Sequence, residues 1–199
     1  MNMLTELIPV TSEFKLIRKE RSFESEFTGQ SQVLSDPVSY WAVELVFKNI
    51  PNKEARKLIG TLAKLRGAGG HFRLKDHSNC AADGLGGQYV VDYFSTSLPG
   101  LVAIKGAPDS KKLADVGDMV EINGELKMVL GEVVGSYDNV AWIEIEPWMR
   151  APVTGGERVT FNEPTGLFHL PPNFEIPRLT SKKLVHAEIT IEAIEVLTK

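Results

Sequence analysis

The chain has 199 residues, 43% of them hydrophobic, so it is long enough for one large domain or two small ones with a substantial core. Its 22 basic and 26 acidic residues form no long run of like charge, which argues against a nucleic-acid-binding arm or a membrane-surface patch. The single cysteine, Cys80, excludes an internal disulfide framework and fits folding in a reducing compartment. The N-terminus lacks the pattern of a secretory signal, and no apolar run approaches the ~20 residues of a membrane span. We expect a soluble, strand-rich protein made in the cytoplasm.

Residues 14–27 mix charged residues with spaced apolar ones, and their serines are poor helix formers. We predict two short strands here, joined by a charged turn near residues 19–21, and then a loop over residues 29–37. The charge cluster from Arg18 to Arg21 has two interpretations. It is either a solvated hairpin tip or a contact arm that packs on a neighbouring subunit.

Residues 40–74 predict a strand, a helix and a returning strand. Apolar residues at alternate positions give the first strand one hydrophobic face, which consists of Trp41, Val43, Leu45 and Phe47. A helix over residues 52–66 follows, with Asn52 as its N-cap and Gly67 as the left-handed residue after its end. Its apolar stripe at three- and four-residue spacing consists of Ala55, Leu58, Ile59, Leu62 and Leu65. Phe72 and Leu74 then alternate with polar residues, so we expect a sheet covered by a single helix.

Short strand-like runs recur between residues 85 and 163 and are separated by turn formers. The runs are 89–94, 101–104, 119–122, 126–134, 140–145 and 158–161. Asn123-Gly124, between two apolar runs, is a strong signal for a type I′ hairpin. So many short strands in so few residues suit a small barrel, and we predict an OB-like one.

The final segment, residues 184–196, alternates apolar and polar residues until the phase slips at 193–194, which predicts a β-bulge. Its half-buried pattern matches that of the strand at 41–47, so we predict that the two share one antiparallel sheet. The chain is thus expected to be mainly β with one main helix. Residues 1–84 plus 164–199 form the first domain, and the barrel of residues 85–163 is inserted into it.

No motif in the chain predicts catalysis or a cofactor. His71, Asp76, His77 and Cys80 have the spacing closest to a metal site, but no second ligand pair accompanies them, so exposed loop polarity explains them better. The glycine-rich segments lack the sequences of phosphate-binding loops, and no nucleophile motif is present. We expect no catalytic, cofactor-binding or metal-binding residues and no enzyme activity, which leaves a hydrolase as the weakest of three hypotheses.

Trp142 and Trp148 have two interpretations. They are either packing residues or a platform for a sugar or a nucleic-acid base on one face of the barrel. The nearby Glu144 and Glu146 make this region acidic, which disfavours a nucleic acid more than a sugar. A carbohydrate- or nucleic-acid-binding module is therefore the alternative function.

The order of elements resembles that of the distal tail proteins of long non-contractile-tailed bacteriophages, in their short form with an OB-like domain. The residues that carry the resemblance are Tyr40-Trp41, Pro51, Leu65-Arg66-Gly67, Gly117-Asp118, Glu146-Pro147 with Arg150, and Gly166-Leu167-Phe168. It covers roughly residues 14 to 196. It implies a tail-tube-like β-domain that carries the OB-like barrel.

The resemblance also implies a structural protein at the tail tip of the virion. Such proteins form a sixfold ring of identical chains between the tail tube protein and the hub, fibre or receptor-binding proteins. The ring surrounds a channel that passes DNA without binding it, so we expect a neutral to acidic lumen. Unpaired strand edges are natural material for head-to-tail contacts. The interface candidates are Phe14, Arg18, Arg21, Phe23 and Phe27 in the N-terminal strand pair, with Ile189 and Ile191 in the last strand.

Overall fold

The computed structural model describes residues 4, 7–24, 29, 31–77, 88–178 and 185–197, with the backbone alone for residues 20–24 and 31–37. The strands are β1 (Thr11–Glu24), β2 (Ser31–Pro51), β3 (His71–Lys75), β4 (Tyr89–Phe94), β5 (Leu101–Lys105), β6 (Lys112–Ala114), β7 (Met119–Ile122), β8 (Glu125–Val129), β9 (Val133–Val134), β10 (Val140–Glu146), β11 (Arg158–Thr160), β12 (Thr165–His169) and β13 (Val185–Glu195). The helices are α1 (Asn52–Lys64) and the 3₁₀ turn η1 (Gly67–Gly69). The described part of the chain is therefore mainly β, with one α-helix.

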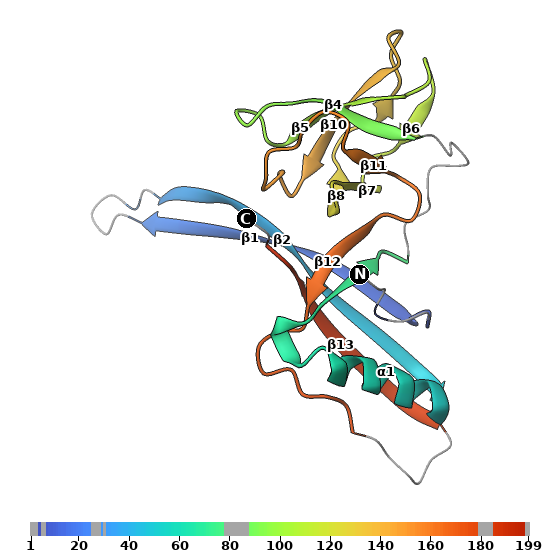
Figure 1. The fold of residues 1–199 in the computed structure, drawn as a ribbon. Coiled ribbons are helices and arrows are strands. Elements are labelled where there is room, and N and C mark those ends of the chain that lie inside the picture. Colours follow the sequence, from blue (N-terminus) through green and yellow to red (C-terminus); the bar gives the residue numbers. More distant parts are fainter. Residues whose placement is uncertain are drawn as a thin grey trace.

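One antiparallel sheet joins the two ends of the described chain. Its strand order is β1-β2-β13-β12-β3, and Figure 1 shows α1 lying along the lower part of this sheet. β13 pairs with β2 from Val185 opposite Pro51 to Ile194 opposite Ala42. The predicted pairing of the last strand with the strand at 41–47 is confirmed.

The segment between β3 and β12 folds into a closed antiparallel barrel with the strand order β10-β5-β4-β11-β7-β8. Figure 1 shows the barrel standing above the sheet. Asn123 and Gly124, between β7 and β8, both have positive φ, as the predicted type I′ turn requires. The barrel has six strands, one more than the five of an OB fold. Of the predicted domain boundaries, 84/85 lies outside the described residues, and 163/164 lies just before β12.

Helix α1 has the predicted buried face. Its four core residues are Ala55, Leu58, Ile59 and Leu62, and Leu65 packs against the same core from just beyond the helix. The prediction for Asn52 was wrong. Pro51 occupies the N-cap, and the Asn52 side chain instead accepts a hydrogen bond from Arg56 Nε at 3.3 Å. At the other end the chain turns left-handed at Arg66, one residue before the predicted Gly67, which also has positive φ.

The core of the sheet lies between α1 and the inward faces of the strands. The alternating residues of β2 are all buried there, with Leu45 at 1% and Phe47 at 2% exposure. Phe72, Leu74 and Phe168 join them from β3 and β12. The alternating apolar residues of the strands and the apolar face of α1 thus pack into one core cluster, as the sequence predicted.

β1 and β2 form a longer hairpin than the sequence predicted. The expected turn at residues 19–21 lies inside β1, and the expected loop at 29–37 is strand from Ser31 onward. Both predictions were wrong because the two segments pair with each other on both sides of a single register shift. Alternation within either segment alone does not reveal such long-range pairing.

The register of this hairpin changes once along its length. Arg18 pairs with Ser39, whereas Glu20 pairs with Ser35, so β2 carries extra residues at this point. Pro37 lies in the irregular stretch. Proline has no N–H to donate to a ladder, so an interruption of the pairing is where a strand tolerates it.

The predicted bulge at residues 193–194 of the last strand was wrong. Pairing runs without interruption from Glu188 to Ile194, and Ala193 and Glu195 continue the inward face. The change of face lies earlier, at residues 187–188 near the left-handed Asn49 of β2. The sequence suggested a slip there because Ala193 and Ile194 are adjacent apolar residues and the next inward position, Glu195, is charged.

Replacing Leu62 tests the docking of α1 on the sheet. Leu62 is fully buried, so Leu62→Ala should lower the free energy of unfolding by about 2–5 kcal/mol, as other large-to-small core changes do. Lys57→Ala, on the exposed face of the same helix, should change it by no more than about 0.5 kcal/mol. Urea unfolding followed by circular dichroism measures both. Equal effects would mean that this face of the helix is not docked.

Candidate functional site

A buried ion pair joins the barrel to the sheet. Arg150, which follows β10, donates from Nη1 and Nη2 to both carboxylate oxygens of Glu195 at 2.8 and 2.7 Å. Its Nη2 also donates to the backbone oxygen of Ser39 on β2 at 3.0 Å. Glu195 is 2% exposed, and its Oε2 also accepts from the Trp41 backbone N–H at 2.9 Å. Bidentate pairing of this kind fixes both distance and orientation.

A second buried pair lies beside the first. Lys127 on β8 is fully buried, and its Nζ donates to Glu125 Oε2 at 2.6 Å and to the Trp148 carbonyl at 3.0 Å. Burial lowers the pKa of the Lys127 ammonium, and the charge of Glu125 opposes that shift. Glu125 also lies 3.6 Å from Arg150 Nη1, so the two pairs form one charge network.

Two further contacts fix the barrel against the sheet. The Trp41 indole N–H of β2 donates to the Leu126 carbonyl of β8 at 3.0 Å. Arg73 of β3 donates to Glu121 Oε1 of β7 at 2.7 Å and to Thr165 Oγ1 at 2.7 Å. The Thr165 hydroxyl in turn donates to Glu121 Oε2 at 2.8 Å, so these bonds link β3 and β12 of the sheet to β7 of the barrel. Ion pairs and hydrogen bonds between the barrel and the sheet thus hold this junction together.

Sequence reasoning did not find this joint, although Arg150 stood among the residues of the family resemblance. The one available signal in the sequence was a charged residue at a strand position that faces the core. Glu195 continues the two-residue alternation of Ile189, Ile191 and Ala193, which places it inward, where an unpaired charge is costly. Lys127 alternates with the apolar Leu126 and Met128, so its pattern does not indicate that it is buried. Arg150, the partner of Glu195, is 45 residues away, so that pair could not be read from the sequence, whereas Lys127 and Glu125 are only two residues apart.

Of the predicted interface residues, the structure buries Ile189 and Ile191 and leaves Phe14 partly buried. Ile189 and Ile191 are 2% and 0% exposed and face the core beneath α1, so their side chains offer no surface to a neighbour. Phe14 packs edge-on against Trp41 at 6.2 Å and Phe168 at 6.0 Å between ring centroids. For the two isoleucines this is a correction: their alternation reflects the core face of β13.

The other interface candidates lie along the outer part of the hairpin. The Arg18 side chain is 55% exposed, and its Nε lies 3.6 Å from Glu146 Oε1. Arg21 and Phe23 lie opposite Leu34 and Gln32 in the backbone pairing, and the structure describes only their backbone. Phe27 lies outside the described residues.

Trp142 and Trp148 both lie on the outside of the barrel and are 52% and 42% exposed. Trp142 contacts Tyr93 edge-on at 6.3 Å between centroids. Trp148 lines a pocket together with Glu144, which stands two residues from Trp142 on the same outer face of β10. Trp142 is not a core residue, so the packing interpretation was wrong for it, whereas Trp148 is partly buried against Gly100, as expected.

The described residues hold no group of three or more histidine, cysteine, aspartate or glutamate side chains that could bind a metal ion. Of the four residues with metal-like spacing, His71, Asp76 and His77 are described, and Cys80 lies outside the described residues. Burial, followed by the charge of Lys75, lowers the pKa of His77. Within the described chain, no helix has the length and apolar character needed to cross a membrane.

No protein-family model matches this chain, and no curated protein matches its sequence.

Replacing Arg150 tests the joint between barrel and sheet. Arg150→Met leaves the buried Glu195 carboxylate without its cation, so the free energy of unfolding should fall by about 3–5 kcal/mol. The control is Lys48→Ala, which removes an exposed ion pair with Glu188 and should cost about 0–1 kcal/mol. Urea titrations at neutral pH give both values. A loss for Arg150→Met as small as the control's would contradict the role of this pair.

Proposed function

We propose that this chain is a structural protein of a bacteriophage virion that assembles head-to-tail with copies of itself into a ring at the tail tip. In this role it joins the tail tube to the hub and the fibre or receptor-binding proteins and leaves a channel for DNA. The family resemblance supports the location, the sixfold number, the tail-tube-like first domain and the OB-like character of the barrel. The shape of the β1–β2 hairpin supports the assembly.

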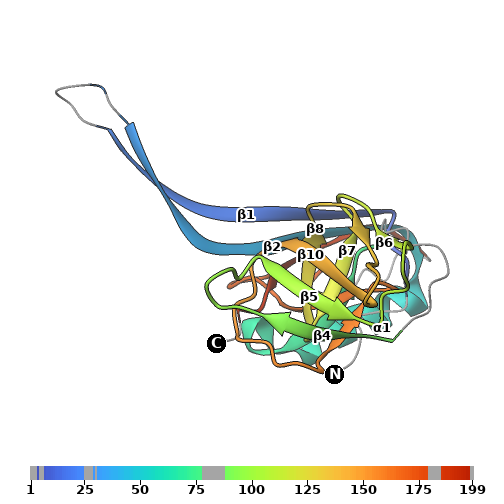
Figure 2. The ribbon, with the colours of Figure 1, turned by 90° about the horizontal axis from the view of Figure 1, so that it is seen from above.

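Within the described residues, no third strand pairs with the outer half of this hairpin. β13 pairs with β2 only between Ala42 and Pro51, whereas β1 stays paired with β2 as far as Glu24 opposite Ser31. We call the part beyond the register shift, residues 20–24 and 31–35, the arm. Figures 1 and 2 show the arm projecting well away from the barrel and the sheet.

An isolated two-stranded ribbon is marginally stable in water, because it lacks a packed face and has two open edges. Contact with a neighbouring molecule supplies what the arm lacks. A projecting element that docks on a different surface of an identical neighbour makes a heterologous contact, and such contacts close into rings when the rotation permits. The base of the arm is anchored by Ser39, whose Oγ donates to Glu146 Oε1 at 2.6 Å.

The test is removal of the arm. Arg18 and Ser39 are paired, so an Asn-Gly turn in place of residues 19–38 should close a shortened hairpin. We expect the complete chain to form rings in negative-stain images and light scattering, and the shortened chain to remain folded but monomeric. Circular dichroism and thermal unfolding check the fold, and Lys57→Ala is the control that should assemble normally.

Two outcomes would contradict the proposal. One is a complete chain that stays monomeric at high concentration, both alone and with its tail tube and hub proteins. The other is a shortened chain that assembles as well as the complete one. In addition, a ring whose lumen is lined mainly by lysine and arginine would contradict the expected passage of DNA.

A further inference from the structure

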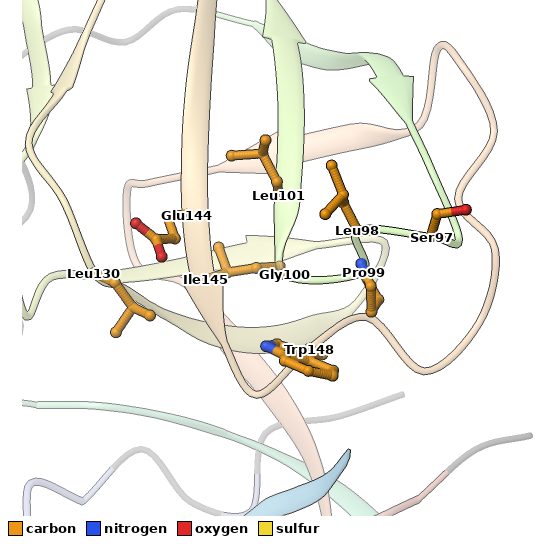
Figure 3. A pocket seen from close by; sticks show the side chains of 9 residues that line it. All are labelled: Ser97, Leu98, Pro99, Gly100, Leu101, Leu130, Glu144, Ile145 and Trp148. Carbon is orange, nitrogen blue, oxygen red and sulfur yellow. The ribbon is translucent and has the colours of Figure 1, made fainter.

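A pocket of about 490 Å³ opens on the outer side of the barrel. Its lining residues are Ser97, Leu98, Pro99, Gly100, Leu101, Leu130, Glu144, Ile145 and Trp148. Figure 3 shows the Trp148 indole beneath the turn formed by Pro99 and Gly100, with the Glu144 carboxylate to one side. The volume falls within the ~300–1,000 Å³ of typical small-ligand sites, and the walls are mostly apolar, as in such sites.

Backbone hydrogen bonds hold the walls of this pocket in place. Ile145 N donates to the Gly100 carbonyl at 2.8 Å, and Met149 N donates to the Pro99 carbonyl at 3.0 Å. On the other side, Leu130 N donates to the Glu144 carbonyl at 2.8 Å. The loop before β5 and the segment after β10 are therefore fixed to each other. A pocket formed in this way loses little entropy when a ligand binds.

The position of Trp148 depends on Gly100. A Cβ on Gly100 would lie 2.8 Å from both Cδ1 and Nε1 of the indole, so only glycine lets the ring rest against this turn. The Trp148 carbonyl is held by the buried Lys127, as described above. Trp148 is nevertheless 42% exposed, so part of its surface is available for stacking.

The charge of the pocket selects among ligands. Glu144 is the one charged residue in its lining, and within the described chain its carboxylate has no hydrogen-bond or ion-pair partner. A carboxylate accepts hydrogen bonds from hydroxyl or ammonium groups and repels phosphate. The lining contains no lysine or arginine to hold an anion. The pocket therefore favours a neutral or cationic ligand.

Aromatic surface continues beyond the pocket. Trp142 stands two residues before Glu144 on the same face of β10, about 7 Å along the strand, and the exposed Tyr93 contacts it. Leu98, at 60% exposure, lies at the pocket's other wall. The site is thus an aromatic strip with a carboxylate at its centre, and such exposed apolar surface with a polar group marks a binding site.

We propose that this pocket binds a glycan chain of neutral or amino sugars. The C–H face of one sugar ring lies on Trp148, a hydroxyl or ammonium group donates to Glu144, and the next part of the chain extends toward Trp142. A sugar ring has an apolar face and a rim of hydroxyl groups, which matches stacking surface and acceptor together. The proposal does not depend on the ring assembly, because all of its residues belong to one barrel.

Titration calorimetry and tryptophan fluorescence on the complete chain test the site. The probes are tetrasaccharides of glucose, N-acetylglucosamine and glucosamine, with a single-stranded oligothymidine and an oligolysine peptide for comparison. We expect at least one saccharide to bind in a saturable way. Gly100→Ala, which displaces the indole, and Glu144→Gln, which removes the charge at nearly constant shape, should each weaken binding by about tenfold or more.

Tyr137→Ala is the matched control, because Tyr137 is an 87% exposed aromatic residue outside the pocket, and it should bind like the unchanged chain. Circular dichroism confirms that each variant folds, and the exposed Glu144→Gln change keeps the test valid should Gly100→Ala fail to fold. The proposal is overturned when none of the saccharides binds, or when binding survives both pocket changes. It is also overturned when oligothymidine or oligolysine occupies the site more tightly than every saccharide.

Discussion

The buried charge network around Arg150 and Glu195 fixes the barrel against the sheet. Glu195 ends the central strand β13, and Arg150 leaves the barrel, so their bidentate pair joins two regions that share no sheet. Burying a carboxylate is costly unless a cation and hydrogen-bond donors surround it. Arg150 and the Trp41 backbone N–H meet that need together. The barrel can therefore keep one position on the sheet.

The same segment serves both proposed activities. At the base of the arm, the Glu146 carboxylate accepts a hydrogen bond from Ser39 and forms an ion pair with Arg18. Two residues later, Trp148 lines the pocket. The buried Lys127 holds the backbone between them through the Trp148 carbonyl. A ring built through the arm would thus carry each barrel, and its pocket, in a fixed orientation around the channel. That arrangement suits a tail-tip component whose barrel meets glycans while its sheet forms the wall.

Features of the fold that depend on local pattern could be predicted. Alternation identified the core face of β2, the three- and four-residue spacing identified the buried face of α1, and Asn123-Gly124 identified a hairpin. Features that depend on distant partners could not. The arm is strand because its two segments, far from the core, pair with each other. Ile189 and Ile191 resembled edge residues but face the core, since β13 lies between β2 and β12.

The sequence by itself determined a mainly β chain with one docked helix, and it left Trp142 and Trp148 as either packing residues or a ligand platform. Only the tertiary structure decided how the barrel is attached, where the hairpin leaves the body, and that Glu144 and Trp148 share a pocket. The reason is physical. Periodicity records which face of an element avoids water, whereas a buried charge or a pocket requires groups from separate elements to meet. Glu195 and Arg150 are 45 residues apart, and Trp41 and Leu126 are 85 apart, so folding alone brings them together.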